Sequence, residues 1–407
     1  MTYERASRPT PEVVIVGASV AGLEALLALH ELAGDRVRLT LVAPERDFVD
    51  RPMTVVEPFG LGQAHRHPVE PITSHVGATL VRGSVSEVRP AEQRVLLSGG
   101  GAVGYDTLVL APGARSTPAY DHSVTVGAER WADAMRELVG SVERGEIRRV
   151  AFIAPTSIGW TLPLYELALL TSHAARASAV EPEMALITRE ERPLAVFGTQ
   201  ASASAGHWLR SSGIEFVGDT SAEVRPGMVM LEPGHRALPV DAVVALPLVR
   251  GPRIQGLPAD DFGFIPVDSH GRVHGLADVY AAGDATNFRV KQGGLAAQQA
   301  DAVAAHIAAD LGASVTPAGF SPVLRGMLFS GGDPQFLRTR DLHDADEGTT
   351  SLAPLWWPPT KIAGRYLGPY LLGGRPSEVF APPPGGFADV DIELDTAADP
   401  KEAPAAG

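Results

Sequence analysis

The strongest constraint on the fold is a plan that this 407-residue chain repeats: an apolar strand, a turn, an apolar helix and a second strand. The first copy spans residues 13–42 and predicts a helix at 23–32. The second spans residues 149–188 and predicts a helix at 162–177. Parallel strands need such a crossover between them, so each copy is typical of a βαβ unit. The sequence therefore predicts an α/β protein with two parallel sheets.

Apolar patterns outside the two copies indicate the domain arrangement. Residues 80–97 and 107–110 predict a β meander that returns to the first sheet, because Gly and Pro separate their apolar runs. A strand at 279–282 and an Ala-rich helix at 294–311 predict that the first domain resumes after the second. We expect a first domain at 1–116 and 264–325, a second domain at 117–263, a C-terminal interface or lid segment at 326–381 and a disordered tail at 382–407.

Composition narrows the chemistry and the partners. The net charge of −14 disfavours nucleic acid, whose binding depends on Lys and Arg releasing the counterions of the phosphates. The chain has no cysteine, which excludes disulfides, thiolate nucleophiles, Cys-ligated zinc and iron–sulfur clusters. His65, His67 and His75 lack ligand spacing, so the sequence predicts no metal site.

The hydropathy pattern predicts a cytoplasmic protein. Only four apolar residues, 13–16, follow a short polar lead, which is typical of a strand and not of a signal peptide. No stretch reaches the roughly 18–20 apolar residues that cross a bilayer. Any membrane contact is therefore expected to be peripheral.

The turn of the first copy, GASVAG, has the spacing of a dinucleotide-binding fingerprint. Gly17 permits the tight turn after the strand, Gly22 lets helix and strand pack closely, and Ser19 stands at the middle glycine position. Ala18 lies in the same loop, whose N–H groups at the helix start favour a pyrophosphate. Glu45 is the nearest acid after the second strand and is the candidate for holding the ribose. A plain strand-to-helix turn is the alternative.

Two further segments complete a flavin signature. Residues 105–115 read YDTLVLAPGAR, and residues 279–284 read VYAAGD. With GASVAG, they resemble the flavoproteins with two dinucleotide-binding domains, in particular the sulfide:quinone oxidoreductases and type II NADH dehydrogenases of the pyridine nucleotide-disulfide oxidoreductase-like group. The resemblance covers roughly residues 12–330. It implies two Rossmann-like FAD/NAD(P)-binding domains, the first of them discontinuous, and FAD as the cofactor.

The resemblance implies roles for two groups of residues. Ala111, Pro112 and Gly113 match the stretch that passes the FAD diphosphate, while Gly283 and Asp284 match the pair whose acid holds the ribitol. An Asp at a strand end accepts hydrogen bonds from hydroxyls, which supports the second role. A helix cap is the alternative for Gly283 and Asp284.

Further candidates lie where the family approaches the flavin ring. Arg51 and Pro52 follow the second strand, and Val85 lies in the next apolar run. Lys291 would place positive charge beside the ring and stabilise the reduced flavin, and Gln292 would face the cofactor or the acceptor. For Arg51 and Pro52 the alternative is a simple loop. For Lys291 and Gln292 it is a solvated helix start.

The turn of the second copy disfavours the usual binding of a nicotinamide dinucleotide. Residues 154–160 read APTSIGW, so only Gly159 remains of a glycine fingerprint. Pro155 has no N–H to donate to a phosphate, and residues 156–157 are bulkier than glycine. Residues 189–191, Arg-Glu-Glu, follow the second strand and either contact a ribose or form a solvated turn.

The same segment resembles the stretch of sulfide:quinone oxidoreductases that carries a catalytic cysteine before a Tyr–Glu pair. Trp160 stands about where that cysteine would be, and Tyr165 and Glu166 remain. Without a thiol, only the flavin carries electrons. Glu166 is a proton carrier beside the flavin if it is buried. Otherwise it faces solvent or a neighbouring Arg.

The aromatic segment at 355–372 mixes Trp and Tyr with Lys361, Arg365 and several prolines. This composition is typical of an interfacial segment on a membrane. Because the prolines limit helix length, a lid on the first domain and a homodimer contact remain as alternatives.

The sequence thus predicts an FAD-dependent oxidoreductase that takes two electrons from a small-molecule donor and passes them through a non-covalent flavin to a quinone or another diffusible acceptor. NAD(P)H stays open as the donor. One alternative is a soluble NAD(P)H-dependent reductase of the ferredoxin type, because GASVAG is similar to the first loop of such reductases. Another is a flavin-binding sensor without catalysis, because the second loop lacks its glycines.

Overall fold

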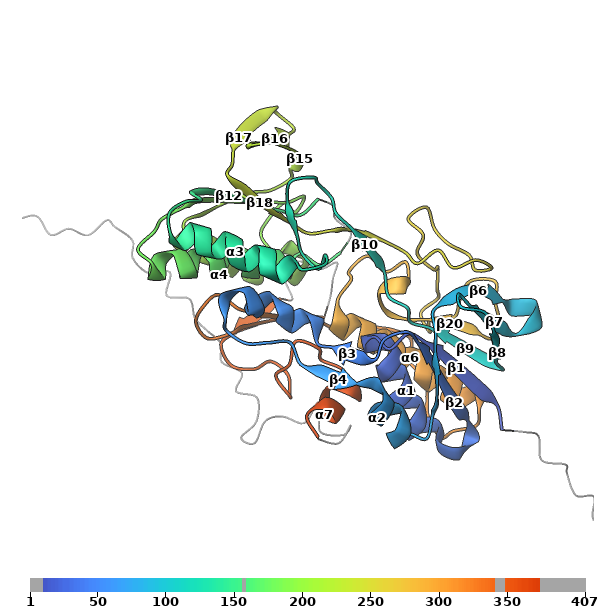
Figure 1. Ribbon diagram of the computed structural model, residues 1–407. Coiled ribbons are helices and arrows are strands. Elements are labelled where there is room, and N and C mark those ends of the chain that lie inside the picture. Colours follow the sequence, from blue (N-terminus) through green and yellow to red (C-terminus); the bar gives the residue numbers. More distant parts are fainter. Residues whose placement is uncertain (1–9, 156–158, 341–347, 374–407) are drawn as a thin grey trace, which may run out of the picture.

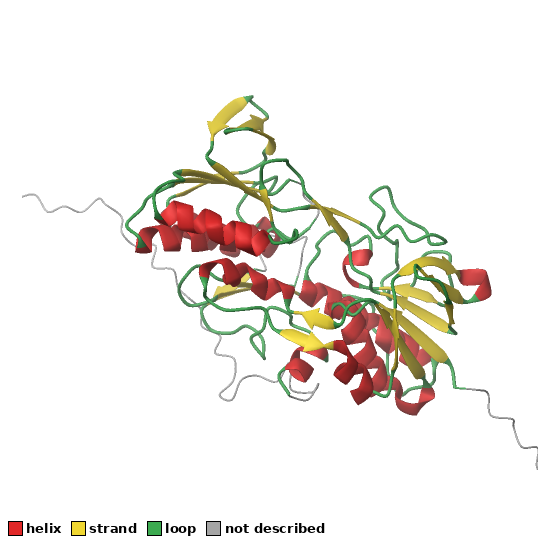
Figure 2. Cartoon of the chain, viewed as in Figure 1, coloured by secondary structure: helices red, strands yellow, loops and turns green. Residues whose placement is uncertain are grey.

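The computed structural model describes residues 10–155, 159–340 and 348–373 and shows two α/β domains side by side (Figure 1). Each domain contains a five-stranded parallel sheet with helices packed against it, as Figure 2 shows. The predicted fold class is therefore confirmed.

The first sheet is formed by segments from both ends of the chain. Its strands lie in the order β20 (Val279–Ala281), β9 (Thr107–Leu110), β1 (Glu12–Val16), β2 (Arg38–Ala43) and β5 (Thr79–Arg82). Helices α1 (Val20–Ala33) and α6 (Gly293–Asp310) pack against each other on one face. Both were predicted from the apolar pattern, with small shifts at their ends.

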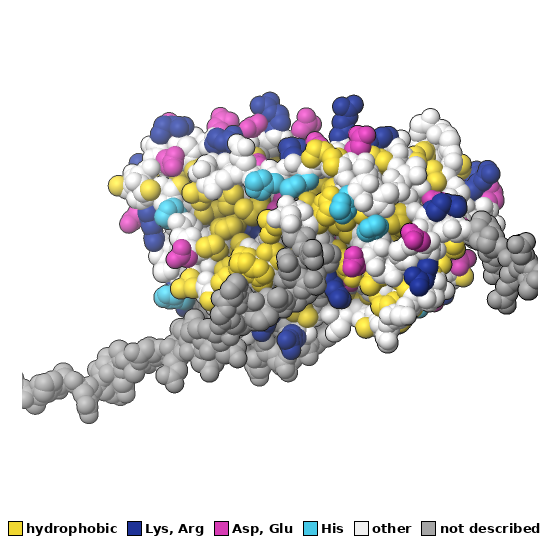
Figure 3. Space-filling view, turned by 90° about the horizontal axis from the view of Figure 1, so that it is seen from below, with side chains coloured by type: hydrophobic (Ala, Val, Ile, Leu, Met, Phe, Trp, Pro, Cys, Tyr) yellow, Lys and Arg dark blue, Asp and Glu magenta, His cyan; other side chains and the backbone are white. Residues whose placement is uncertain are grey.

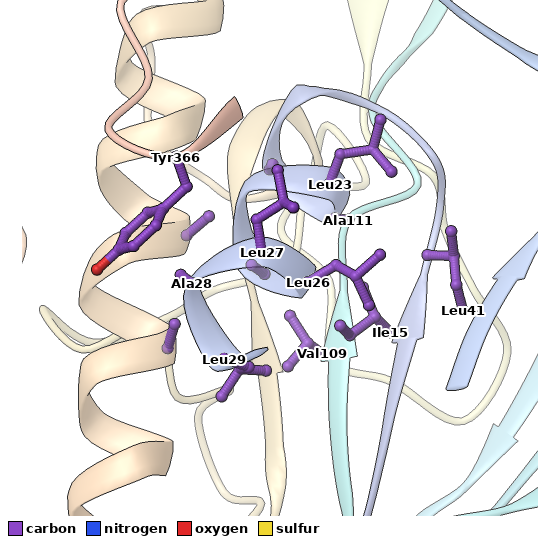
Figure 4. Close-up of a cluster of buried hydrophobic side chains, with 14 of the residues drawn as sticks. Ile15, Leu23, Leu26, Leu27, Ala28, Leu29, Leu41, Val109, Ala111 and Tyr366 are labelled. Atoms are coloured by element: carbon purple, nitrogen blue, oxygen red, sulfur yellow. The ribbon is translucent and has the colours of Figure 1, made fainter. Parts of the chain in front are cut away.

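An apolar core joins α1 to this sheet. Figure 4 shows Leu26 of α1 beside Ile15 of β1, and Leu29 beside Val109 of β9. These four side chains are fully buried. Helix α1 is apolar on most of its surface because α6 covers the side that the sheet leaves open.

The region after β2 forms small elements at the rim of the first domain. They are β3 (Asp47–Val49), a 3-10 helix at Arg51–Phe59, β4 (Arg66–Pro68) and α2 (Val69–His75). The expected meander at 80–97 is wrong in part. A separate antiparallel sheet forms instead from β6 (Val85–Arg89), β7 (Arg94–Leu97) and β8 (Ala102–Gly104). Its Val88 and Val95 cover the face of the parallel sheet opposite α1.

The second domain repeats the plan with a different outer layer. Its parallel strands lie in the order β11 (Val124–Thr125), β18 (Ala242–Ala245), β12 (Arg149–Ile153), β13 (Glu183–Ile187) and β14 (Ile214–Val217). One face carries α3 (Trp131–Glu143), α4 (Leu162–Ala177) and α5 (Thr199–Ser211). The other carries the antiparallel strands β15 (Ser221–Arg225), β16 (Met228–Glu232) and β17 (Arg236–Pro239). Phe152 faces the helices and its neighbours Ala151 and Ile153 face β15–β17, as strand alternation requires.

The chain crosses between the domains twice, on one narrow ribbon. β10 (Arg115–Thr117) leads out of the first domain and pairs antiparallel with β19 (Leu248–Arg250), which leads back (Figure 1). The expected boundary at 116 lies within β10.

The C-terminal segment lies across both domains. It consists of the antiparallel sheet β21 (Leu324–Leu328), β22 (Gln335–Thr339) and β23 (Thr349–Ser351), followed by α7 (Leu367–Leu371). β21 contacts α4 of the second domain and α6 of the first, and α7 contacts α1. The tail expected at 382–407 lies outside the described residues. Among the helices of the described ranges, none combines the length and the apolar character needed to span a bilayer.

Candidate functional site

A cavity of about 1040 Å³ lies where the two domains and the C-terminal segment meet. Its volume is at the upper end of the roughly 300–1,000 Å³ of small-molecule pockets, which suits a large cofactor with room for a second ligand. The cavity brings together most of the residues selected from the sequence: Gly17, Ala18, Ser19, Glu45, Arg51, Pro52, Ala111, Pro112, Gly113, Glu166, Gly283, Asp284, Lys291 and Gln292. Gly22 lies beneath the first loop, outside the lining.

Val85 does not belong to this group. It lies on β6, where its partly buried side chain packs on the core of the first sheet and does not line the cavity. The sequence indicated only that Val85 lies in an apolar run. It did not indicate which face of the sheet its side chain would cover.

The first loop has the close backbone approach that its glycines predict. A Cβ on Gly22 would lie 1.8 Å from the carbonyl oxygen of Gly17, and a Cβ on Gly17, at φ +101°, would lie 2.3 Å from that of Ala111. The Ser19 hydroxyl donates to the Ala111 carbonyl over 2.9 Å. Ser19 therefore ties the loop to the 111–113 segment with its side chain, and α1 begins directly behind it.

Asp284 lies in the turn after β20, close to the start of α1. Burial raises the pKa of its carboxyl, and the charges of Lys291 and Arg51 oppose that rise. Gln299 accepts the N–H of Gly283 over 2.7 Å, which fixes the turn. Gly283 at φ +74° leaves no room for a side chain, because a Cβ would lie 2.9 Å from that of Ala21. The loop before α1 and the turn before α6 thus meet at one edge.

Lys291 is held in place by its surroundings. Its ammonium donates to the Thr286 carbonyl over 2.6 Å and lies 3.8 Å from the ring centre of Phe264. Burial lowers the pKa of Lys291 to about 8, against the attraction of Asp284 and Asp260. The ammonium form therefore predominates at pH 7, which places a cation in the cavity wall.

Gln292 has a structural task that the sequence did not indicate. Its side-chain oxygen accepts the N–H of Leu295 and caps α6, while its amide nitrogen donates to the Arg325 carbonyl. Both ends of the amide are therefore used within the protein, although Gln292 lines the cavity. Glu45 also lines the cavity but is exposed at its rim.

The buried partner of Glu166 comes from the C-terminal segment. Glu166 is fully buried on α4, so the alternative of a solvent-facing or Arg-paired carboxylate is wrong. Its Oε1 accepts the Lys361 ammonium over 2.5 Å and the N–H of Phe329 over 3.0 Å. Within the described residues, its Oε2 is buried without a hydrogen-bond partner. Burial raises the pKa of Glu166 and lowers that of Lys361, while each charge opposes the shift of the other.

Lys361 is the main site residue that sequence reasoning missed. The sequence feature that could have identified it is a lysine between Thr360 and Ile362, inside an aromatic and apolar run. Nearby Asp50, whose pKa burial raises, acts on Lys361 from the first domain. The Lys361 ammonium of the C-terminal segment therefore interacts with Glu166 of the second domain and with Asp50 of the first.

The second loop differs sharply from the first. Arg189 and Glu190 line the cavity. Glu190 is not a solvated turn residue, because its carboxylate is hydrogen-bonded within the protein. Its carboxylate accepts the Tyr165 hydroxyl over 2.8 Å and the hydroxyl of Thr161, which stands directly before α4, over 3.3 Å. Burial raises the pKa of Glu190 to about 7. The bulky positions 156 and 157 lie outside the described residues, and Pro163 removes one N–H from the first turn of α4.

The aromatic segment is partly packed and partly exposed. Trp356 and Tyr366 are buried against the rest of the chain, whereas Trp357 and Leu372 expose 36% and 62% of their surface. The packed part contacts α1 through α7. The exposed part leaves the membrane and homodimer alternatives open.

Known proteins match this chain in both sequence and structure. The pyridine nucleotide-disulphide oxidoreductase family matches residues 11–301. Two NADH dehydrogenase-like proteins of Mycobacterium tuberculosis, from strains CDC 1551 / Oshkosh and ATCC 25618 / H37Rv, are 28% identical over 296 and 300 residues. Each match covers 68% of this chain and 73% of the relative.

Among solved structures, the sulfide:quinone oxidoreductase from the hyperthermophilic bacterium Aquifex aeolicus has a TM-score of 0.76 at 16% identity, covering 84% of this chain and 86% of that one. The ferredoxin reductase for the CYP199A2 system from Rhodopseudomonas palustris has a TM-score of 0.61 at 21% identity, covering 81% of each chain. These two likenesses support the fold. Since the family match spans well over half of the sequence, the chain belongs to the pyridine nucleotide-disulphide oxidoreductase family and is an FAD-dependent oxidoreductase.

Proposed function

We propose that this enzyme passes two electrons through a non-covalent flavin to a quinone or another small diffusible acceptor. One observation carries the proposal. One cavity is lined both by the first dinucleotide loop and by the buried Glu166–Lys361 ion pair, and the chain has no thiol to take part in electron transfer.

The residues of the cavity suit FAD. The N–H groups at the start of α1, beside Gly17 and Ser19, would hold the diphosphate, and Asp284 would accept hydrogen bonds from the ribitol hydroxyls. Glu45 and Lys291 both line the cavity; we assign Glu45 to the ribose of a bound FAD, and Lys291 would supply positive charge to its redox-active ring. When bound, FAD supplies a carrier that accepts and releases two electrons.

The Glu166–Lys361 pair suits an acceptor that gains protons with its electrons, as a quinone does. Both groups line the cavity; burial raises the pKa of Glu166 and lowers that of Lys361, which reduces the cost of moving a proton between them. The unpartnered Glu166 Oε2 is the atom at which a proton can be held without breaking an existing hydrogen bond. We therefore assign proton delivery to this pair.

The acceptor route runs past the C-terminal segment. The segment exposes the large apolar side chains of Leu352, Trp357 and Leu372 by 36–62%. Figure 3 shows hydrophobic side chains on the face seen from below. An apolar acceptor dissolved in a membrane would reach the enzyme through such a surface. We propose peripheral membrane contact there. The competing proposal is that a second copy of the chain covers these side chains in a homodimer.

Anaerobic reduction experiments test the proposal. FAD-loaded protein should show the visible absorption of a flavin, lose it on mixing with a chemical reductant, and regain it within seconds on addition of a soluble quinone. Recovery no faster than that of free FAD under the same conditions would contradict the proposed acceptor and favour the non-catalytic sensor. Membrane contact is tested by sedimentation with vesicles, with size-exclusion chromatography reporting a dimer.

A nicotinamide-dependent reductase of the ferredoxin type is the second candidate. It is favoured by Arg189 and Glu190, which line the cavity at the end of β13, where a dinucleotide fold places its ribose contacts. Mixing the enzyme with NADH or NADPH without oxygen tests the donor of this candidate, while quinone reduction tests the acceptor of the first. Bleaching at a catalytically useful rate supports the nicotinamide donor, and no bleaching at millimolar concentration excludes it.

A further inference from the structure

Trp160 gives the cavity an aromatic side chain to which neither the cofactor nor the proton delivery assigns a role. It lies two residues before α4 and lines the cavity. Its indole packs against the fully buried ring of Phe197, with the ring centres 5.6 Å apart and the planes inclined by 64°. This is the edge-to-face arrangement that aromatic pairs prefer. Trp160 itself is only partly buried, so part of the indole surface remains accessible.

Backbone hydrogen bonds to the first domain fix the position of Trp160. The N–H of the preceding residue, Gly159, donates to the Arg289 carbonyl over 3.2 Å, and the Gly159 carbonyl accepts the N–H of Lys291 over 3.3 Å. Gly159 has φ +130°, a backbone conformation that favours glycine. Trp160 therefore follows directly on a contact with the segment that we assign to the redox-active ring.

The wall beside Trp160 continues along α4 to the buried ion pair. Leu162 and Glu166 lie one helical turn apart on α4, so their side chains share a face, and both line the cavity. Gly326 of β21 packs on the same group. A Cβ on Gly326 would lie 2.7 Å from the ring of Phe197 and 3.4 Å from the Leu162 side chain. The indole and the proton-holding carboxyl are thus parts of one packed wall.

The C-terminal segment holds the other member of the ion pair in a fixed place. Lys361 of this segment pairs with Glu166. Further along, the buried Glu24 of α1 accepts the backbone N–H groups of Tyr366 and Leu367, each over 2.8 Å. The ion pair is therefore anchored from the second domain and, through the segment, from the first.

The wall belongs to the second domain, whereas every residue that we assign to FAD belongs to the first. We propose that Trp160 is a specificity-determining residue whose indole supports a planar aromatic ring of the second substrate, beside the Glu166–Lys361 pair. A two-ring quinone covers more of an indole than a one-ring quinone does, so the platform favours fused-ring acceptors. The identity of the ligand as an electron acceptor rests on the proposed function. Binding of its ring to Trp160 does not.

Equilibrium dialysis of the oxidised, FAD-loaded enzyme tests the platform without electron transfer. The probes are menadione, a two-ring quinone, and duroquinone, a one-ring quinone. Trp160→Leu removes the aromatic surface, so the affinity for menadione should fall about tenfold and that for duroquinone about twofold. Trp160→Phe keeps one ring and should lose about threefold for menadione, with duroquinone nearly unchanged.

Trp208→Leu is the matched control. Trp208 is a partly buried tryptophan of the second domain that lies on α5 and does not line the cavity. Its replacement should leave both affinities within about twofold of wild type. An unchanged ratio of the two affinities in either Trp160 variant would overturn the proposal, so the test survives if Trp160→Leu fails to fold. A loss of FAD affinity in Trp160→Phe would also overturn it, because the indole would then contact the cofactor.

Quinone reduction, measured with a chemical reductant as donor, separates this inference from the proposed function. Trp160→Phe should raise KM for menadione about threefold and change kcat by less than about twofold, because the indole binds the ring and moves no proton. If menadione binding depends on Trp160 but no quinone is reduced, the proposed function fails and the platform stands. If quinones are reduced with the same KM by wild type and both variants, the platform fails and the proposed function stands.

Discussion

The first and second loops of this protein occupy equivalent places in two similar domains, but among the described residues only the first shows the close glycine packing that is predicted for a phosphate-binding loop. At the first, Gly17 and Gly22 bring strand and helix so close that no Cβ fits. At the second, Pro155 and Pro163 lack N–H groups, and the Glu190 carboxylate binds the hydroxyls beside the start of α4. The strand–helix–strand unit survives because packing requires it, whereas phosphate binding depends on a few positions that change without harm to the core.

The largest effect, on FAD affinity, is expected from adding a methyl group at the first loop. Gly22→Ala places a Cβ against the Gly17 carbonyl, so the backbone must move away from the cofactor. We expect FAD affinity to fall by about 100-fold or more, equivalent to at least about 2.7 kcal/mol. Fluorescence titration of the apoprotein with FAD measures this.

Gly206→Ala in the second domain is the matched control, because its Cβ would displace only the flexible end of Arg210. It should leave FAD affinity within about twofold. An equal loss in both variants would mean that general destabilisation, and not the loop, controls cofactor binding.

The next effect concerns the ion pair that joins the second domain to the C-terminal segment. Glu166→Gln leaves the Lys361 ammonium buried without its counter-ion, so stability should fall by about 3–5 kcal/mol, measured by denaturant unfolding of the FAD-loaded enzyme. Quinone reduction should fall more than flavin reduction by the donor, because only the former uses this proton.

The double variant Glu166→Gln/Lys361→Met provides the control. It removes both charges and should recover most of the stability but not the quinone reduction. If the activity returned with the stability, the pair would have a structural role only.

The smallest effect sharpens the comparison of the two loops. Glu190 has a pKa raised to about 7, so its negative charge in the cavity wall appears mainly above pH 7. Glu190→Gln should therefore tighten NADH binding about tenfold at pH 8 and change it little at pH 6, since wild-type Glu190 is then largely protonated. Dissociation constants at the two pH values measure this effect, with the exposed Glu191→Gln as control. A ratio independent of pH would remove Glu190 from donor selection.

Sequence reasoning succeeded where the information is local. The βαβ units, the exact bounds of α4 and the close packing of GASVAG follow from apolar periodicity and from glycine positions within about thirty residues. It was less successful for β6–β8, because alternating short strands specify pairing with each other as readily as with the parallel sheet.

By itself, then, the sequence determined two dinucleotide folds, the flavin signature and the absence of thiol chemistry, since each depends on residue type and short spacing. Only the tertiary structure decided that Glu166 pairs with Lys361, 195 residues away, that Glu190 turns back to Tyr165, and that Glu24 holds the C-terminal segment. The physical reason is that a charged side chain is stable in the interior only beside a partner. Which residue becomes that partner depends on which elements pack together, and a local sequence pattern does not contain this information.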